Sequence, residues 1–175
     1  MTRRHTFMYD FLKSLLEEEK KPKGTYVGVR LTPQSKAKLR KFAKQIKVPN
    51  LIDNDDMHIT VIYSRNHLDN YTPPGKLETT IKAEVNTLTV FQKEEEGSKR
   101  VLVVTLKSPE LHKRHTEIMK EPGATYDFDK YIPHVTLSYD CGDFDETGHS
   151  IKKFIKEPLE IDEEYEEELK LDSYE

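Results

Sequence analysis

This chain of 175 residues has little of what marks secreted or membrane proteins. Its single cysteine, Cys141, excludes an internal disulfide and a zinc site built on cysteines. No apolar run is long enough to cross a bilayer, so we expect no membrane contact. Residues 1–21 carry charges throughout and lack a small-residue cleavage site, which predicts no secretory signal. We therefore expect a cytoplasmic protein, with the size of one domain or of two small packed lobes.

The chain also lacks a glycine-rich loop and an excess of positive charge. Its 7 glycines form no phosphate-cradling motif, and Gly75 and Gly97 are predicted to lie in turns. The net charge of −4 argues against a protein that coats long nucleic acid.

Charge is spread unevenly along the chain. Residues 1–50 hold 13 Lys and Arg against 4 Asp and Glu, whereas residues 141–175 hold 4 against 13. The basic part would attract a phosphate ligand. The alternative is that both parts are solvated faces that attract one another, and the sequence leaves both interpretations open.

Apolar periodicity and turn residues predict an α+β chain with antiparallel strands. Helices are expected at residues 7–20, 33–47, 109–120 and 147–156, and a loop at residues 66–76. Strands are expected at residues 26–31, 58–64, 133–139 and 159–171, with a long hairpin formed by residues 79–92 and 100–107. Thr32 before Pro33 supports the second helix, because a hydroxyl N-cap followed by proline is typical of a helix start.

Two of the expected strands share one sequence pattern. Residues 57–64 are Met-His-Ile-Thr-Val-Ile-Tyr-Ser, and residues 133–140 are Pro-His-Val-Thr-Leu-Ser-Tyr-Asp. Each segment contains a histidine, an apolar residue, a threonine and a second apolar residue, with a tyrosine five places after the histidine. This long-range repetition is the strongest functional signal in the chain.

The paired segments predict a site for acid–base chemistry on phosphodiesters. Because side chains alternate across a strand, His58 and Thr60 share one face, as do His134 and Thr136. With the two strands facing a groove, one imidazole takes a proton from the attacking oxygen and the other protonates the leaving oxygen. Histidine suits both tasks because its usual pKa is about 6.5. Each threonine hydroxyl can donate to a phosphoryl oxygen, so the scheme needs no metal.

A structural explanation of the same pattern exists. Two histidines at strand starts can be satisfied by backbone carbonyls without any catalytic role, although their shared context favours the catalytic hypothesis. Strict alternation places Tyr63 and Tyr139 on the face opposite the histidines, so we expect core or supporting roles for these tyrosines.

Candidates for substrate binding lie outside the two segments. Tyr26 and Phe91 are candidates for stacking on a nucleobase, with core packing as the alternative for each. Glu164 can accept a hydrogen bond from a base amino group, but it belongs to an acidic run at 163–168 for which a solvated tail is the alternative.

The other histidines lack a comparable context, and we expect them on the surface: His5, His67, His112, His115 and His149. His112 and His115 are three residues apart on an expected helix, a geometry that can bind metal. No third histidine or carboxylate at a suitable spacing supports that use, so we expect neither a metal nor a cofactor.

The two His-x-Thr segments, 76 residues apart, resemble the paired signature of the 2H phosphoesterase superfamily. Within it the chain is most similar to the bacteriophage anti-CBASS nucleases, and the resemblance covers about residues 24–172. Further segments carry it: Gly24-Thr25-Tyr26, Tyr63-Ser64-Arg65, Gly123-Ala124-Thr125-Tyr126-Asp127 and Glu164-Tyr165. The resemblance implies a two-lobed fold with antiparallel sheets around a central groove, formed by residues 24–175, after an N-terminal helical extension at residues 1–23.

The resemblance also implies an activity. The expected enzyme acts in the host cytosol and hydrolyses cyclic di- or trinucleotides with 3′–5′ linkages, the signals of CBASS immunity, to linear products. The ribose 2′-hydroxyl would attack the phosphorus, and which histidine is the base stays open. One alternative is a 2H enzyme that acts on 2′,3′-cyclic phosphate ends of RNA with the same catalytic residues. Another is a sponge that only binds the nucleotide, which would not need two proton-transfer groups.

Overall fold

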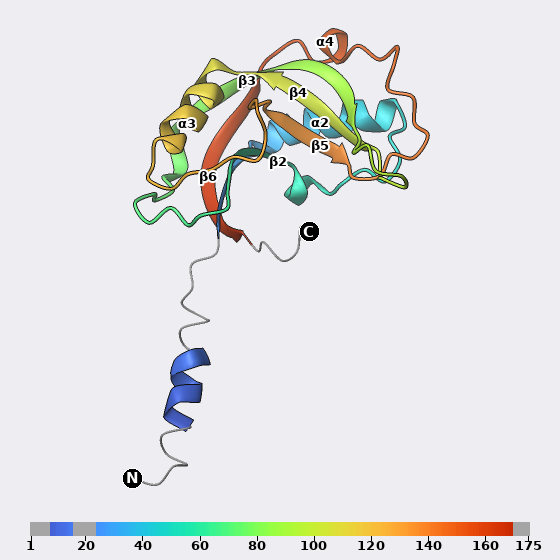
Figure 1. Ribbon diagram of the computed structural model, residues 1–175. Helices are drawn as coiled ribbons and strands as arrows, with labels where there is room; N and C mark the ends of the chain where they lie inside the picture. The colour runs from blue at the N-terminus through green and yellow to red at the C-terminus, as the bar shows by residue number, and fades with distance from the viewer. Residues whose placement is uncertain (1–7, 16–23, 170–175) are drawn as a thin grey trace.

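The computed structural model describes residues 8–15 and 24–169, within which six strands close into one antiparallel barrel in the order β1-β2-β5-β4-β3-β6 (Figure 1). The strands are β1 (Gly24–Leu31), β2 (His58–Ser64), β3 (Gly75–Phe91), β4 (Val101–Lys107), β5 (His134–Ser138) and β6 (Leu159–Leu169). The helices between them are α2 (Pro33–Gln45), the short 3-10 helix η1 (Asn54–Asp56), α3 (Pro109–Met119) and α4 (Ile151–Phe154). Residues 8–15 are also helical.

The barrel consists of two halves with the same order of elements. The first half is β1–α2–β2, with β6 paired to the other edge of β1. The second half is β4–α3–β5, with β3 paired to the other edge of β4. The halves meet at two seams, β3 against β6 and β2 against β5. The two strands that carry the His-x-Thr segments therefore meet at a seam.

Helices α2 and α3 start in the same way. The Thr32 hydroxyl accepts a hydrogen bond from the Ser35 N–H at 3.2 Å, and the Ser108 hydroxyl accepts from the Leu111 N–H at 3.2 Å. A proline follows each cap, where its fixed backbone angle suits the first helical turn. The predicted start of the helix at Thr32 is confirmed, and each helix leads the chain back toward a histidine strand.

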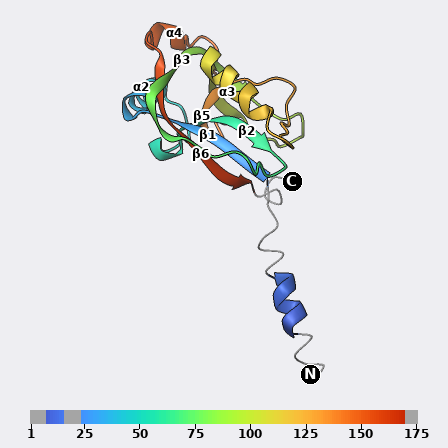
Figure 2. The same cartoon turned by 90° about the vertical axis from the view of Figure 1, so that its left-hand side faces the viewer.

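Alternate side chains divide each of these strands between a core face and a second face. Val27 and Val29 of β1 and Ile59 and Val61 of β2 are fully buried in one apolar cluster. The same cluster contains Leu39 and Phe42 of α2 and Leu111 and Ile118 of α3. Figure 1 and Figure 2 show that α2 and α3 pack at different places around the barrel. The second face of β1 and β2 carries half-buried polar and aromatic side chains instead, and it is this face that forms the site.

The α+β class with antiparallel strands is confirmed, but the prediction of separate sheets is wrong for the described strands, which belong to one closed sheet. The long strand β3 is the reason. Its first part pairs with β6 and its last part pairs with β4, so one continuous strand joins the two halves. The sequence pattern marks strands but does not indicate that one of them serves both halves.

Several predicted boundaries differ from the structure. The loop at 66–76 ends one to two residues early, because Gly75 and Lys76 already pair with β6. The helix at 147–156 is reduced to α4, because Asp145 accepts hydrogen bonds from both the N–H and the hydroxyl of Thr147 in a local turn. The helix predicted at 7–20 is confirmed at 8–15, and its remainder lies outside the described residues, as do residues 170–171 of the last strand. No helix in the described part of the chain has the length and apolarity that crossing a membrane requires.

Candidate active site

The seam between β2 and β5 brings the two His-x-Thr segments together. Ile59 pairs with Val135 in antiparallel register, and both side chains are fully buried on the core face. The residues on either side of this pair therefore share the second face, and each histidine lies across from the threonine of the other strand. The opposed pairs are His58 with Thr136, and Thr60 with His134. Diagonal neighbours across antiparallel strands are typically about 7–8 Å apart, which leaves room for a phosphate between the two imidazoles.

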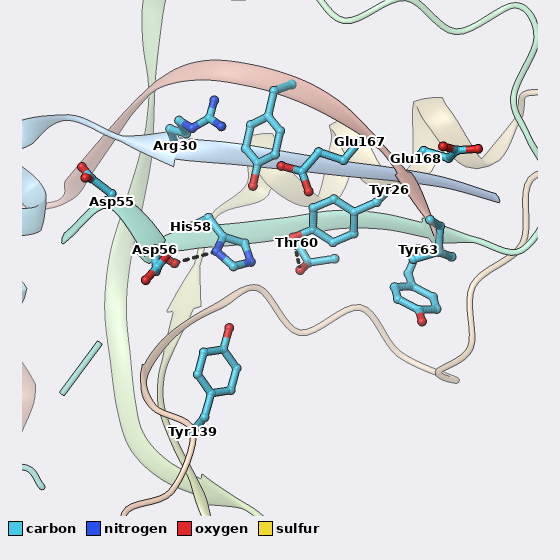
Figure 3. A pocket seen from close by; sticks show the side chains of 12 residues that line it. Tyr26, Arg30, Asp55, Asp56, His58, Thr60, Tyr63, Tyr139, Glu167 and Glu168 are labelled. Carbon is cyan, nitrogen blue, oxygen red and sulfur yellow. Dashed lines mark hydrogen bonds between the residues drawn. The ribbon is translucent and has the colours of Figure 1, made fainter. Parts of the chain in front are cut away.

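Both imidazole rings are oriented by the same backbone contact. The Nδ1 atom of His58 lies 2.8 Å from the carbonyl oxygen of Asp56, and Nδ1 of His134 lies 2.8 Å from the carbonyl oxygen of Ile132. A carbonyl only accepts, so Nδ1 carries the proton and donates it. Nε2 of each ring is then the atom left for proton transfer, as Figure 3 shows for His58.

The environment of His134, including the nearby His58, changes its protonation. Burial lowers the pKa of His134 below its usual 6.5; the carbonyl of Ile132 opposes this shift, and the nearby His58 adds to it. The contribution of His58 to this shift requires the two imidazoles to be close. At neutral pH His134 is therefore uncharged, in the state that accepts a proton.

A β-bulge interrupts the alternation of side chains in β2. Gly28 of β1 pairs with Thr60, but the preceding Val27 pairs with Ile62, so Val61 is an extra residue. An extra residue moves everything after it to the opposite face. The burial pattern agrees, because Val61 and Ile62 are consecutive buried residues.

Strand β5 contains the same bulge at the equivalent place. Val103 of β4 pairs with Thr136, but Leu102 pairs with Ser138, which leaves Leu137 as the extra residue. The prediction that Tyr63 and Tyr139 face away from the histidines is therefore wrong. Both tyrosines line a pocket together with His58, because each bulge lies between the threonine and the tyrosine of its segment.

This pocket has a volume of about 480 Å³ and lies beside the seam, mostly in the first half of the barrel (Figure 3). Four tyrosines line it, namely Tyr26, Tyr63, Tyr139 and Tyr165. Carboxylates come from Asp55 and Asp56 before β2 and from Glu167 and Glu168 of β6. The volume and the aromatic lining are typical of a site for a small organic ligand.

Tyr26 was predicted as a substrate contact, and the structure places it in this pocket. Its hydroxyl lies 2.8 Å from Oγ1 of Thr60, and its ring meets the His58 ring edge-on with centroids 6.1 Å apart. Burial raises the pKa of Tyr26, and the nearby Tyr165 adds to the shift, so the hydroxyl stays protonated. Tyr26 thus joins the first His-x-Thr segment to the wall of the pocket.

Sequence reasoning missed the neighbours of Tyr26. Gly28 lies opposite Tyr165, and a Cβ at Gly28 would come within 2.6 Å of the Tyr165 ring. The Arg30 guanidinium lies 3.9 Å from the centroid of that ring, with Nη1 3.5 Å from Glu163. A usable signal was present, because Tyr26, Gly28 and Arg30 alternate along one strand and so share a face.

Phe91 was predicted to stack on a base, but the structure does not place it among the residues that line this pocket. It lies instead at the end of β3 in the second half, with its ring edge-on to His134 and centroids 5.2 Å apart. Phe91 therefore packs against the second histidine, as Tyr26 packs against the first.

Both predictions for Glu164, a contact to a base and a place in a solvated tail, are wrong. The residue lies neither in the pocket nor in a solvated tail. It is 1% exposed, and Arg114 of α3 donates to its two carboxylate oxygens at 2.7 Å each. The Tyr71 hydroxyl donates to the same carboxylate at 2.6 Å. Alternation along β6 places Glu164 on the helix side, and its neighbours Tyr165 and Glu167 occupy the pocket side.

His115 was predicted on the surface but supports the bulge of β2. Its Nδ1 lies 2.7 Å from the Val61 carbonyl oxygen, and its ring stacks on Tyr131 with centroids 4.3 Å apart. The Tyr131 hydroxyl donates to the Thr60 carbonyl oxygen at 2.8 Å. The carbonyls beside the bulge are thus satisfied by side chains. In the described residues no group of three or more His, Cys, Asp and Glu is placed to hold a metal ion.

Fold and site together define a class of protein: an antiparallel α+β barrel in which two bulged His-x-Thr strands oppose each other beside a tyrosine-lined pocket. Residues 23–175 match the profile of the family described as anti-CBASS protein Acb1. The chain belongs to this family.

Curated relatives agree with this assignment. The chain is 34% identical over 149 residues to the anti-CBASS protein Acb1 of Enterobacteria phage T4, which covers 85% of this chain and 90% of the relative. It is 36% identical over 117 residues to the protein of the same name from Vibrio phage KVP40, covering 67% of this chain and 73% of the relative. The protein of Yersinia phage phiR1-RT is 30% identical over 162 residues, covering 90% of this chain and 96% of the relative.

Proposed function

We propose that this chain is a metal-independent phosphodiesterase that opens cyclic di- or trinucleotides with 3′–5′ linkages to linear products, so that a phage evades CBASS immunity in the host cytosol. The observation that carries the proposal is the register of β2 and β5, which sets two imidazoles diagonally across one seam with a threonine opposite each. The name shared by the relatives, anti-CBASS protein, supports the biological role.

In the first step of this reaction, the ribose 2′-hydroxyl attacks the neighbouring phosphorus. His134 is uncharged near neutral pH because of its burial, so its Nε2 accepts the proton of the 2′-hydroxyl as the new O–P bond forms. Protonated His58 donates from Nε2 to the 5′-oxygen as its bond to phosphorus breaks. The hydroxyls of Thr60 and Thr136 donate to the non-bridging oxygens, where negative charge increases.

In the second step, water opens the resulting 2′,3′-cyclic phosphate and the histidines exchange roles. His58 accepts a proton from the attacking water, and His134 returns the proton that it took in the first step to the departing 2′-oxygen. Both imidazoles are then in their starting states, and the product is a linear nucleotide.

The walls of the pocket favour a nucleotide over a simple phosphate ester. Tyr26 and Tyr165 offer aromatic surface to a base, and Glu167 offers a carboxylate that can accept from base N–H groups. Substrate binding by Tyr26 is part of the proposal, whereas Phe91 acts through its packing against His134.

We further infer that the closed barrel is a variant of the 2H phosphoesterase fold in which each half is one lobe. The repeated strand–helix–strand order and the shared helix caps support this interpretation. Residues 24–175 would form the enzyme and residues 1–23 a helical extension, a division supported by the family match beginning at residue 23.

The direct test incubates purified protein in EDTA with a 3′,3′-cyclic dinucleotide and, separately, with RNA that ends in a 2′,3′-cyclic phosphate. Products are resolved by chromatography beside the His58→Ala variant. We expect fast opening of the cyclic dinucleotide by the wild type and its loss in the variant. Cleavage of the RNA end alone would contradict the proposed substrate, and tight binding without turnover of either ligand would contradict an enzymatic function.

A further inference from the structure

One wall of the pocket in the first half comes from the second half. Tyr139 directly follows Ser138, the last residue of β5, yet it lines the pocket together with His58 and Tyr26. Figure 3 shows its ring on the opposite side of the pocket from Arg30, with the hydroxyl directed toward His58. The pocket is therefore completed across the seam between β2 and β5.

The bulge of β5 explains why Tyr139 reaches this position. Without the extra residue Leu137, strict alternation would place Tyr139 on the core face with Val135. The bulge instead turns an aromatic side chain, 52% exposed, to the mouth of the pocket. Single exposed aromatic residues are common on proteins, but this one is placed at a ligand-sized cavity by a backbone irregularity.

Three tyrosines converge on the same space: Tyr26 from β1, Tyr165 from β6, and Tyr139 from the residue that follows β5. Burial is the main cause that raises the pKa of Tyr26 and of Tyr165, and Tyr139 contributes a smaller increase to both. Such a contribution requires Tyr139 to lie near both hydroxyls. Tyr26 and Tyr165 are partly buried, so Tyr139 is the most exposed member of the group and the one with the most surface left for a ligand to cover.

We propose that Tyr139 is a substrate-binding residue that packs its ring on a nucleobase held between it and the rings of Tyr26 and Tyr165. The proposal rests on the proposed function, because it takes the ligand to be a nucleotide. An aromatic ring binds any base through its π-face, so Tyr139 contributes affinity rather than base selectivity. The bound base would also bridge the two halves at the β2–β5 seam.

Binding without turnover is the sharpest test. A 3′,3′-cyclic dinucleotide is titrated into His134→Ala protein, which lacks one proton-transfer group but keeps the lining of the pocket, alone and combined with Tyr139→Phe or Tyr139→Leu. Stacking on one base is worth about 1–3 kcal/mol, so we expect Tyr139→Leu to weaken binding about 5- to 150-fold. We expect Tyr139→Phe to stay within about threefold, because it keeps the π-face.

Phe128→Leu in the same background is the matched control. Phe128 is 68% exposed and does not line the pocket, so its loss removes an exposed ring elsewhere and should leave the dissociation constant unchanged. In the active enzyme, Tyr139→Leu should raise KM while kcat stays within a few-fold, since a contact equal in ground and transition states affects binding alone.

Each other outcome decides against the assignment. Unchanged binding in Tyr139→Leu would overturn it while leaving the proposed function intact. An equal loss in Tyr139→Phe would assign the effect to the hydroxyl and overturn the stacking role. No binding by the parent His134→Ala protein, together with no turnover by the wild type, would overturn the proposed function and the assignment with it.

Discussion

The two halves of the barrel carry the same His-x-Thr strand but differ in the strands beside it. In the first half Thr60 lies beside Gly28, and Gly28 lies beside Tyr165. At the equivalent places of the second half, Thr136 lies beside Val103, and Val103 lies beside Thr89. The glycine leaves space that the Tyr165 ring occupies, whereas Val103 fills the corresponding space and is itself fully buried.

This difference separates proton transfer from recognition. Both halves supply an imidazole whose Nδ1 donates to the carbonyl two residues earlier, so the two proton-transfer groups are prepared alike. The first half supplies three of the four tyrosine rings, the arginine and the carboxylates around the described pocket, and the second half supplies only Tyr139. A symmetric catalytic pair therefore lies beside an asymmetric binding surface, and the following predictions test that separation.

The largest effect is expected from removing either histidine. His58→Ala and His134→Ala should each lower kcat/KM for a cyclic dinucleotide about 10²- to 10⁴-fold, because each removes one proton transfer. The double variant should lose little more than one single variant, since the two groups act as a unit. His149→Ala, which removes a histidine stacked on Phe144, is the control. Full activity in either single variant would refute an equal role for the halves.

The next largest effect is a loss of stability, which should differ between the two faces of β6 in the first half. Arg114→Met leaves the buried Glu164 without its cation and should lower the free energy of unfolding by about 3–5 kcal/mol. Arg30→Met removes one of the two cations beside Glu163, whose side chain is 26% exposed and keeps Lys76 at 3.5 Å, and should cost less than about 1 kcal/mol. Urea unfolding, monitored by circular dichroism, measures the free energy of unfolding of both variants. Equal losses would show that the pocket side is as important for stability as the helix side.

Gly28→Val tests the comparison, because it gives the first half the valine that the second half has at the equivalent place, Val103. The new side chain would displace the Tyr165 ring, and loss of one stacking surface should raise KM about 5- to 150-fold with a smaller change in kcat. Combined with Tyr165→Ala, the substitution should cause little further loss, because both remove the same ring from the pocket. Additive losses in steady-state kinetics would mean that Gly28 acts through something other than Tyr165.

The smallest effect is a shift in pH dependence. Burial lowers the pKa of His134, so the midpoint of the acid limb of kcat/KM should lie below pH 6.5. As pH decreases through the lowered pKa, His134 becomes charged and can no longer accept the 2′-hydroxyl proton. The free energy of unfolding should also decrease as pH decreases, because the unfolded chain binds this proton at a higher pH than the folded protein does. An acid limb above pH 6.5 would assign the base role to another group.

The strands, the helix starts and the paired histidines were predictable because they depend on neighbouring residues. Alternation in 58–61 and the Thr32–Pro33 cap are local patterns with local causes. The bulges were not predictable, because Val61 and Leu137 are apolar residues that suit a regular strand equally well. Strict alternation therefore misplaced Tyr63 and Tyr139.

The errors at longer range have a different cause. Glu164 is buried because of Arg114 and Tyr71, which are 50 and 93 residues away in the chain. No local pattern in an acidic run distinguishes the one carboxylate with such partners from its solvated neighbours. In the same way, the space at Gly28 has meaning only once β6 is placed beside β1.

The most direct measurement of the central claim uses a cyclic dinucleotide in which the 2′-hydroxyl next to each phosphate is replaced by hydrogen. Our account predicts that the wild-type protein binds this analogue about as tightly as the ribonucleotide, because the base contacts remain, and that it forms no linear product, because the nucleophile is missing. Opening of the analogue at a rate near that of the ribonucleotide would contradict the account.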